Sequence, residues 1–126
     1  MANPIKVLIV DDDPGMREGM ALSLKRAGFI CYQARSGEDA LNMIRPGAFD
    51  AVVTDFKMPG GMDGHELTAR LRALDPSLPV LLVTAYGSNI GKEAMRLGAF
   101  DYLSKPFSPA ELVSAVKKSL RTDEKL

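Results

Sequence analysis

Short apolar runs rich in β-branched residues alternate with segments of helical periodicity along the whole chain. The runs are Ile5–Val10, Phe29–Ala34, Ala51–Thr54, Val80–Thr84 and Phe100–Ser104. Nearly continuous apolar runs are typical of strands buried on both faces, as in a parallel sheet covered by helices on each side. Because crossovers between parallel strands are right-handed, few topologies remain. The sequence therefore predicts an α/β fold with a doubly wound, five-stranded parallel sheet.

Residues typical of helix ends lie between these runs. The expected starts are Asp13-Pro14 and Ser108-Pro109, and the expected ends are Gly28 and Gly98. An Asp or Ser N-cap followed by proline begins a helix, and Glu111 would complete a capping box with Ser108. Glycine ends a helix by adopting the left-handed conformation. These signals predict helices between the runs, with the fourth over Asn89–Leu97.

Length and composition fit one globular domain. The chain has 126 residues, of which 46% are hydrophobic and 25% are charged. This is enough for a single core and leaves no room for a second folded domain. We expect one domain over residues 1–126, with its core at about 5–120 and a charged tail, 121–126, that frays.

Charge and cysteine content exclude several classes of function. Lys plus Arg and Asp plus Glu both total 16, so net charge gives no reason to expect binding to nucleic acid or to a membrane. Cys31 is the only cysteine, which excludes an intramolecular disulfide and fits a reducing compartment. No run approaches the roughly 18 apolar residues of a membrane span, and the first residues do not resemble a secretory signal. We therefore expect a cytoplasmic protein.

Polar side chains follow most of the predicted strands. Asp11 and Asp12 follow the first run, Asp55 follows the third, Thr84 ends the fourth and Lys105 follows the fifth. In a parallel sheet the carboxyl ends of the strands open onto one crevice. We therefore expect these side chains to converge although they lie far apart in the sequence.

The three consecutive aspartates at 11–13 have different expected roles. An isolated run of this kind is more simply a solvated turn with one cap. Here Asp13 before Pro14 is explained as the cap, whereas Asp11 and Asp12 at the strand end repel each other unless a cation joins them. With Asp55 they form a hard-oxygen site suited to Mg²⁺ (or Mn²⁺). The lack of a Cys and His cluster argues against structural zinc.

A carboxylate in such a site can also act as a nucleophile toward phosphorus and form an aspartyl phosphate. Phosphoryl transfer depends on positioning and charge neutralisation more than on a proton shuttle. A metal ion would neutralise one side of the phosphoryl group, Lys105 would bind a second oxygen, and the Thr84 hydroxyl would donate to a third. The sequence contains every group that this chemistry requires.

Several short motifs that are weak singly occur here together. They are Val10-Asp11-Asp12, Asp55 with Met58, Pro59, Asp63 and Gly64 behind it, Thr84-Ala85, and Lys105-Pro106-Phe107. On these motifs the chain, from about Ile5 to about Leu120, resembles the receiver domain of two-component response regulators. Phe100-Asp101-Tyr102-Leu103 and Thr84-Ala85-Tyr86-Gly87 are most similar to receivers of nitrogen-regulation-type transcription activators.

The resemblance implies a role for each site residue. Asp55 would be the phosphoacceptor, Asp12 a direct metal ligand, Asp11 a ligand through water, and the Lys57 carbonyl a further ligand. Thr84 and Lys105 would bind the phosphoryl group, and Tyr102 would be the aromatic residue whose rotamer reports it. The Lys105–Pro106 bond would be cis, the side chains of Lys57 and Tyr86 would set the lifetime of the aspartyl phosphate, and the strand order would be 2-1-3-4-5.

The resemblance also implies partners. A sensor histidine kinase would donate the phosphoryl group, and the chain would be a switch rather than a turnover enzyme. Its output domain or downstream target is absent from this sequence, and a homodimer would form through the face at about 89–120. Two departures affect these expectations: the loop Met58–Gly64 carries an extra glycine, and the stretch from Thr84 to Lys105 is one residue short.

Other functions fit less well. An aspartate-nucleophile phosphatase needs a second carboxylate two residues after the first, where this chain has Lys57. A flavin or nucleotide carrier of the same fold class would need a phosphate-cradling loop after the first strand, where Asp11 to Pro14 would repel phosphate. A degenerate receiver that signals only through protein contacts stays an alternative. His65, the only histidine, is expected to be solvent-exposed rather than catalytic.

Overall fold

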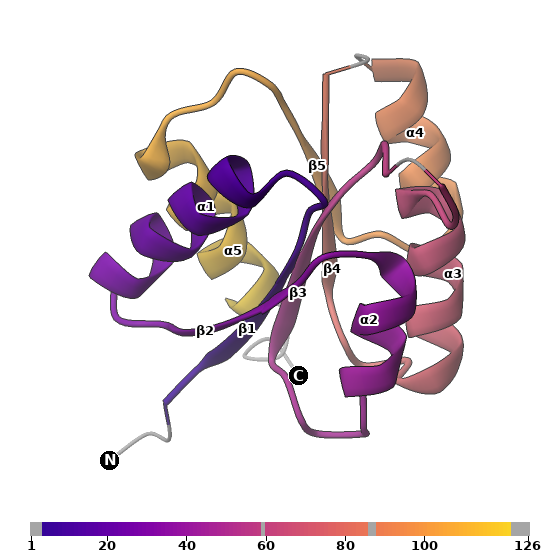
Figure 1. The fold of residues 1–126 in the computed structure, drawn as a ribbon, viewed down its shortest axis with the longest axis horizontal. Helices are drawn as coiled ribbons and strands as arrows, with labels where there is room; N and C mark the ends of the chain where they lie inside the picture. Colours follow the sequence, from indigo (N-terminus) through magenta and orange to yellow (C-terminus); the bar gives the residue numbers. More distant parts are fainter. Residues whose placement is uncertain (1–3, 59, 86–87, 122–126) are drawn as a thin grey trace.

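The computed structural model describes residues 4–58, 60–85 and 88–121, and strands and helices alternate in it as predicted (Figure 1). Its strands are β1 (Lys6–Val10), β2 (Ile30–Ala34), β3 (Ala51–Asp55), β4 (Val80–Thr84) and β5 (Asp101–Ser104). Its helices are α1 (Pro14–Arg26), α2 (Gly37–Met43), α3 (Gly64–Leu74), α4 (Ser88–Arg96) and α5 (Pro109–Arg121). The expected fraying of the tail concerns residues 122–126, which lie outside the described residues.

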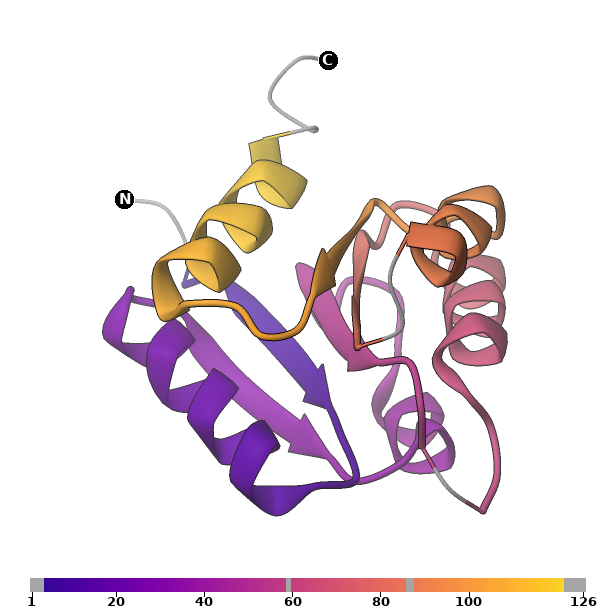
Figure 2. The same ribbon diagram turned by 90° about the horizontal axis from the view of Figure 1, so that it is seen from above.

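The strands form one parallel, five-stranded sheet of order β2-β1-β3-β4-β5. β1 lies between β2 and β3, so that Leu8 is opposite Tyr32 on one side and Val52 on the other. Figures 1 and 2 show α1 and α5 on one face of the sheet and α2, α3 and α4 on the other. The doubly wound fold and its strand order are therefore confirmed.

Alternate residues of the central strands point into two cores, one on each face of the sheet. The core under α1 and α5 includes Val7, Ile9, Leu24, Leu112 and Val116. The core under α2 and α3 includes Leu8, Val10, Ala40, Leu67 and Leu71. Lys6 and Asp11 flank the four apolar residues of β1, so a one-residue slip would carry a charged side chain into one of the cores, and this cost sets the register of the strand and the position at which it ends.

The two edge strands are less buried than the sequence pattern predicts. β1, β3 and β4 are almost entirely buried, whereas Ile30 and Tyr32 of β2 are 39% and 41% exposed. An edge strand has one strand neighbour and incomplete helical cover, so its apolar side chains are only partly enclosed. Tyr32 compensates in part by an edge-to-face contact with Phe49 at 5.5 Å between ring centroids. The prediction of burial on both faces is therefore right for the central strands and wrong for both edge strands, since β5 also has no buried residue.

The predicted helix ends are confirmed. Asp13 Oδ1 accepts from the Gly15 amide at 2.9 Å at the start of α1. The capping box of α5 is complete, because the Glu111 amide donates to Ser108 Oγ at 3.1 Å and the Ser108 amide donates to Glu111 Oε1 at 2.9 Å. Gly28 and Gly98 end α1 and α4 with positive φ, at 101° and 108°. No helix in the described part of the chain is long and apolar enough to cross a membrane.

Candidate functional site

The carboxyl ends of β1, β3, β4 and β5 bring the predicted site residues to one edge of the sheet. Asp11 directly follows β1, Asp55 is the last residue of β3, and Thr84 is the last residue of β4. Thr84 lies opposite Ser104 in the β4–β5 register, and Lys105 follows Ser104. The prediction that these residues lie at the same edge of the sheet is therefore confirmed.

Three carboxylates form an acidic cluster at this edge. Asp11, Asp12 and Asp55 each offer one oxygen, and these oxygens lie within 4.8 Å of one another. Asp11 and Asp55 are buried and Asp12 is exposed. Lys105 Nζ lies 2.9 Å from Asp55 Oδ1, so this carboxylate forms an ion pair with an ammonium group. The cluster has an excess of negative charge and hard oxygen donors, which is the environment that a divalent cation such as Mg²⁺ prefers.

Asp11 has the most perturbed environment of the cluster. Its Oδ1 accepts from the Asp13 amide at 2.9 Å, whereas its Oδ2 is buried and has no hydrogen-bond partner among the described residues. Burial raises the pKa of the Asp11 carboxyl to about 6; the charges of Asp55 and Asp12 add to this, and the Asp13 amide and Lys105 oppose it. An ionised oxygen that is buried without a partner is costly, and a bound cation would remove that cost.

The ends of β4 and β5 are joined beside the cluster. The Thr84 side chain is buried, and its main-chain carbonyl accepts from the Lys105 amide at 2.8 Å. The Lys105–Pro106 peptide bond is cis. In the strand order, β4 and β5 lie on one side of β3, so that Thr84 and Lys105 come from the side of Asp55 opposite to β1 with Asp11 and Asp12.

Tyr102 of β5 packs directly against the backbone of α4. It is half-buried and contacts the small cluster of Leu82, Ala94 and Ala99. A Cβ added at Gly91 would lie 2.4 Å from atoms of the Tyr102 ring, so only glycine leaves room for the ring at this point of α4. Tyr102 therefore occupies an inward position between β4 and α4.

The loop after Asp55 is held at both ends. The Phe56 amide donates to Val83 at 2.9 Å, and the Gly64 amide donates back to the Phe56 carbonyl at 2.7 Å. Between them, Met58 and Met62 are buried in the core under α2 and α3.

The extra residue in this loop falls in a glycine pair. Gly60 adopts a positive φ of 82°, and no described residue lies within 4 Å of a Cβ built there. Lys57, two residues after Asp55, is exposed. Tyr86, Pro59 and Gly87, which the sequence motifs include, lie outside the described residues.

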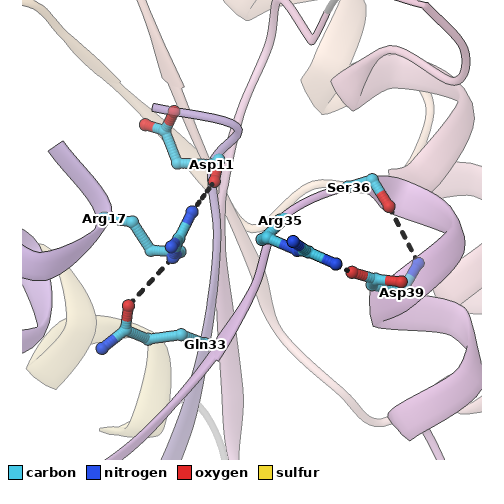
Figure 3. A network of polar contacts seen from close by, with 6 residues as sticks. All are labelled: Asp11, Arg17, Gln33, Arg35, Ser36 and Asp39. Atoms are coloured by element: carbon cyan, nitrogen blue, oxygen red, sulfur yellow. Dashed lines mark hydrogen bonds and ion pairs between the residues drawn. The ribbon is translucent and has the colours of Figure 1, made fainter. Parts of the chain in front are cut away.

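Arg17 and Gln33 touch the site although no sequence pattern indicated them. Figure 3 shows the Arg17 guanidinium between the Asp11 main chain and the Gln33 side chain. Arg17 Nη1 donates to the Asp11 carbonyl at 3.0 Å, and Nε donates to Gln33 Oε1 at 2.9 Å. The predicted strand order already places β2 beside β1, but a single sequence gives no signal for the side-chain conformation that joins Arg17 of α1 to Gln33 of β2.

The expectation that His65 is exposed is wrong. The residue is half-buried, its Nε2 lies 2.9 Å from the Ile90 carbonyl of α4, and its ring lies 4.7 Å from the Phe56 ring between centroids. Gly64 has no side chain, so the first turn of α3 can lie close to the end of β3, where an added Cβ would be 2.7 Å from the Asp55 carbonyl oxygen. The side chain of the next residue, His65, reaches α4. His65 therefore links α3, α4 and the residue after Asp55.

Comparison with known proteins agrees with this geometry. The family described as "Response regulator receiver domain" matches residues 7–117. The chain belongs to this family. It is 45% identical over 114 residues to the response regulator protein FleR of Pseudomonas aeruginosa, covering 90% of this chain and 24% of FleR. It is 38% identical over 116 residues to sporulation initiation phosphotransferase F of Bacillus subtilis, covering 91% of this chain and 93% of that protein.

Solved receiver structures have the same fold. A putative response regulator from Chloroflexus aurantiacus superposes with a TM-score of 0.87 at 42% identity, covering 94% of this chain and 98% of that chain. NtrX from Brucella abortus superposes with a TM-score of 0.90 at 28% identity, covering 97% of this receiver and 28% of NtrX. This receiver spans about a quarter of FleR and about half of two further curated relatives, MprA and PhoB. It is the receiver domain of a two-component response regulator, and such domains are phosphorylation-dependent signalling switches.

Proposed function

We propose that Asp55 of this receiver domain accepts a phosphoryl group from a sensor histidine kinase. The observation that carries the proposal is the position of Asp55 at the end of β3, between the acidic pair Asp11 and Asp12 and the ammonium group of Lys105, whose Nζ lies 2.9 Å from Asp55 Oδ1. A carboxylate placed between a cation site and a lysine can attack phosphorus while the cation and the lysine neutralise the negative charge of the phosphoryl group.

Asp11, Asp12, Asp55 and the Lys57 carbonyl would hold a Mg²⁺ ion. The unpaired, buried Oδ2 of Asp11 supports this assignment, because it lacks the partner that such a group normally has. When bound, the ion supplies charge neutralisation for the carboxylates and for an incoming phosphoryl group. Asp12 is the exposed member of the cluster and so offers the most accessible direct ligand, whereas the buried Asp11 is suited to binding through water.

The reaction exchanges one bond to phosphorus for another. A carboxylate oxygen of Asp55 attacks, the bond from phosphorus to the donor's imidazole nitrogen breaks, and the nitrogen takes a proton as it leaves. Lys105 then moves from the Asp55 carboxylate to a phosphoryl oxygen, and the Thr84 hydroxyl donates to another. Lys57 and Tyr86 would control the access of water and hence the rate of autodephosphorylation, the only turnover that we assign to the chain.

Phosphorylation would be transmitted toward α4, β5 and α5. Thr84 and Lys105 are joined through the main chain at 2.8 Å, so both respond to a new phosphoryl group at the same junction. A shift of Thr84 would move the end of β4, which is paired with β5, and the close contact of the Tyr102 ring of β5 with Gly91 would pass the change to α4. We propose the face at about 89–120 as the output surface and as the interface of a homodimer, with any output domain in a longer protein.

Intact-mass spectrometry after incubation with a small phosphodonor and MgCl₂ tests the proposal. We expect one phosphoryl group on the wild-type chain, none on Asp55→Asn, and full labelling of Asp63→Asn. Asp63 is a matched control because it is an exposed N-cap whose side chain accepts from the Glu66 amide at 2.9 Å, a role that asparagine also fills. An unlabelled wild-type chain would indicate a degenerate receiver, and a labelled Asp55→Asn variant would refute the assignment of Asp55.

Sedimentation with and without a phosphate-mimicking beryllofluoride complex tests the proposed output surface. The mimic should increase the mass of the wild-type particle through dimer formation. An unchanged mass, together with NMR shifts confined to the surroundings of Asp55, would refute the assignment of the 89–120 face.

A further inference from the structure

We propose that Arg17 is a positioning residue for the acidic site: it fixes the peptide between Asp11 and Asp12 by joining it to Gln33 of β2. The inference rests on the proposed function of the acidic cluster as a Mg²⁺ site. It adds a residue of α1 and a residue of the edge strand to the groups on which metal binding depends.

The contacts of Arg17 are with the main chain of the site and not with its carboxylates. Nη1 donates to the Asp11 carbonyl at 3.0 Å and Nε donates to Gln33 Oε1 at 2.9 Å. In Figure 3 the Asp11 carboxylate points away from the guanidinium. Arg17 therefore acts on the direction of the chain as it leaves β1.

The peptide that Arg17 binds lies directly before Asp12, the proposed direct metal ligand. The Asp11 amide already donates to the Ala34 carbonyl of β2 at 3.2 Å, so β2 holds the nitrogen side of Asp11. Arg17 and Gln33 hold the carbonyl on the other side. The next residue, Asp12, is exposed, and the direction of its carboxylate follows from the orientation of the preceding peptide. Loss of the Arg17 contact would allow this peptide to rotate and would change the geometry of the Asp12 ligand.

An arginine suits this position because its planar guanidinium donates from several nitrogens in fixed directions. Here Nη1 donates to Asp11, directly after β1, and Nε donates to Gln33, near the end of β2. A lysine could reach either partner as a point charge, but it would not fix the angle between them. Residues that orient a metal ligand without touching the metal typically change affinity by 10- to 100-fold when they are mutated.

The sign of the effect separates this proposal from plain electrostatics. A positive charge close to an acidic site repels Mg²⁺, so its removal should strengthen binding if charge were its only contribution. If Arg17 orients the peptide, its removal should weaken binding. The two explanations predict opposite changes in the dissociation constant.

Calorimetric titration of the full chain with MgCl₂ provides the test. We expect Arg17→Ala and Gln33→Met to weaken Mg²⁺ binding by about 10-fold each and the double variant to be little worse than either, because both remove the same support. Arg17→Lys should fall between wild type and Arg17→Ala. Arg35→Ala is the matched control: Arg35 is an exposed arginine directly after β2 whose Nε lies 3.7 Å from Asp39 Oδ2, and its loss should change the dissociation constant less than 2-fold.

Urea unfolding in EDTA shows whether each variant is folded at the titration temperature, and Gln33→Met keeps the test valid if Arg17→Ala unfolds. Unchanged or tighter Mg²⁺ binding by the folded Arg17 and Gln33 variants would overturn the positioning role. If the wild-type chain itself binds no Mg²⁺, the proposed metal site fails, which is a different and separately recognisable result.

Discussion

Replacing Asp11 by asparagine should stabilise the metal-free protein although it damages the site. Asp11 is 1% exposed, and its Oδ2 has no hydrogen-bond partner among the described residues. Its pKa is raised, first by burial and then by the charges of Asp55 and Asp12. At neutral pH the folded chain therefore contains an ionised carboxylate that is buried and close to other negative charges. Asparagine removes that charge and has nearly the same shape as aspartate.

The size of the effect follows from the pKa. The rise from the ordinary value of 3.8 to about 6 corresponds to about 3 kcal/mol at about 1.4 kcal/mol per pKa unit. Because the unfolded chain loses this proton first, the free energy of unfolding falls as pH rises from about 4 through about 6. The gain on removing the carboxylate should therefore be up to about 3 kcal/mol at pH 7.5 and only about 0.6 kcal/mol at pH 4.

Urea unfolding followed by far-UV circular dichroism at these two pH values, in EDTA, measures the gain. Asp63→Asn is the control, because it makes the same chemical change at an exposed helix cap and should alter stability little at either pH. With Mg²⁺ at 100 times its dissociation constant, the wild-type chain should gain about 2.7 kcal/mol and Asp11→Asn much less. A metal-free Asp11→Asn variant that is no more stable at pH 7.5, or whose gain is the same at both pH values, would refute the reasoning.

Four substitutions, three of glycines and one of a helix cap, test the packing of the domain by urea unfolding and NMR. Gly64→Ala places a Cβ 2.7 Å from the main-chain carbonyl of β3 and should lower the free energy of unfolding by about 1–3 kcal/mol, whereas Gly19→Ala, an open position in α1, should raise it by about 0.5–1 kcal/mol. Gly91→Ala should displace the Tyr102 ring, and unchanged ring resonances would contradict the close contact described above. Ser108→Ala should cost about 1 kcal/mol through loss of the α5 cap, and a neutral result would show that the capping box contributes nothing.

The sequence predicts the fold and the acidic cluster because both depend on local pattern and backbone geometry. Strand ends of a parallel sheet meet at one edge, so Asp11, Asp12 and Asp55 could be placed together without knowledge of any side-chain contact. Asp13 and Gly28 could be assigned to helix ends for a similar reason, since caps act on the nearest turn.

What the sequence did not predict depends on neighbours that only the assembled fold supplies. Gln33 meets Arg17 through the side-chain conformations that the packing of α1 on β2 allows, and His65 is half-buried because α4 lies over the first turn of α3. Tyr32 is exposed because β2 is an edge strand, whereas its apolar pattern resembles that of the central strands. In each case the residue type alone is compatible with the position expected from the sequence and with the position that the structure shows.

The buried methionines on either side of the glycine pair should let the loop between Met58 and Met62 tolerate a change of length. Met58 and Met62 are 5% and 6% exposed, and Gly60 between them has open space where a side chain would begin. Flexible thioether side chains can settle again in a core after a small displacement. A short peptide tag or a fluorophore attachment site inserted after Gly60 should therefore be carried beside Asp55 without unfolding the domain, as a local reporter of its chemical state.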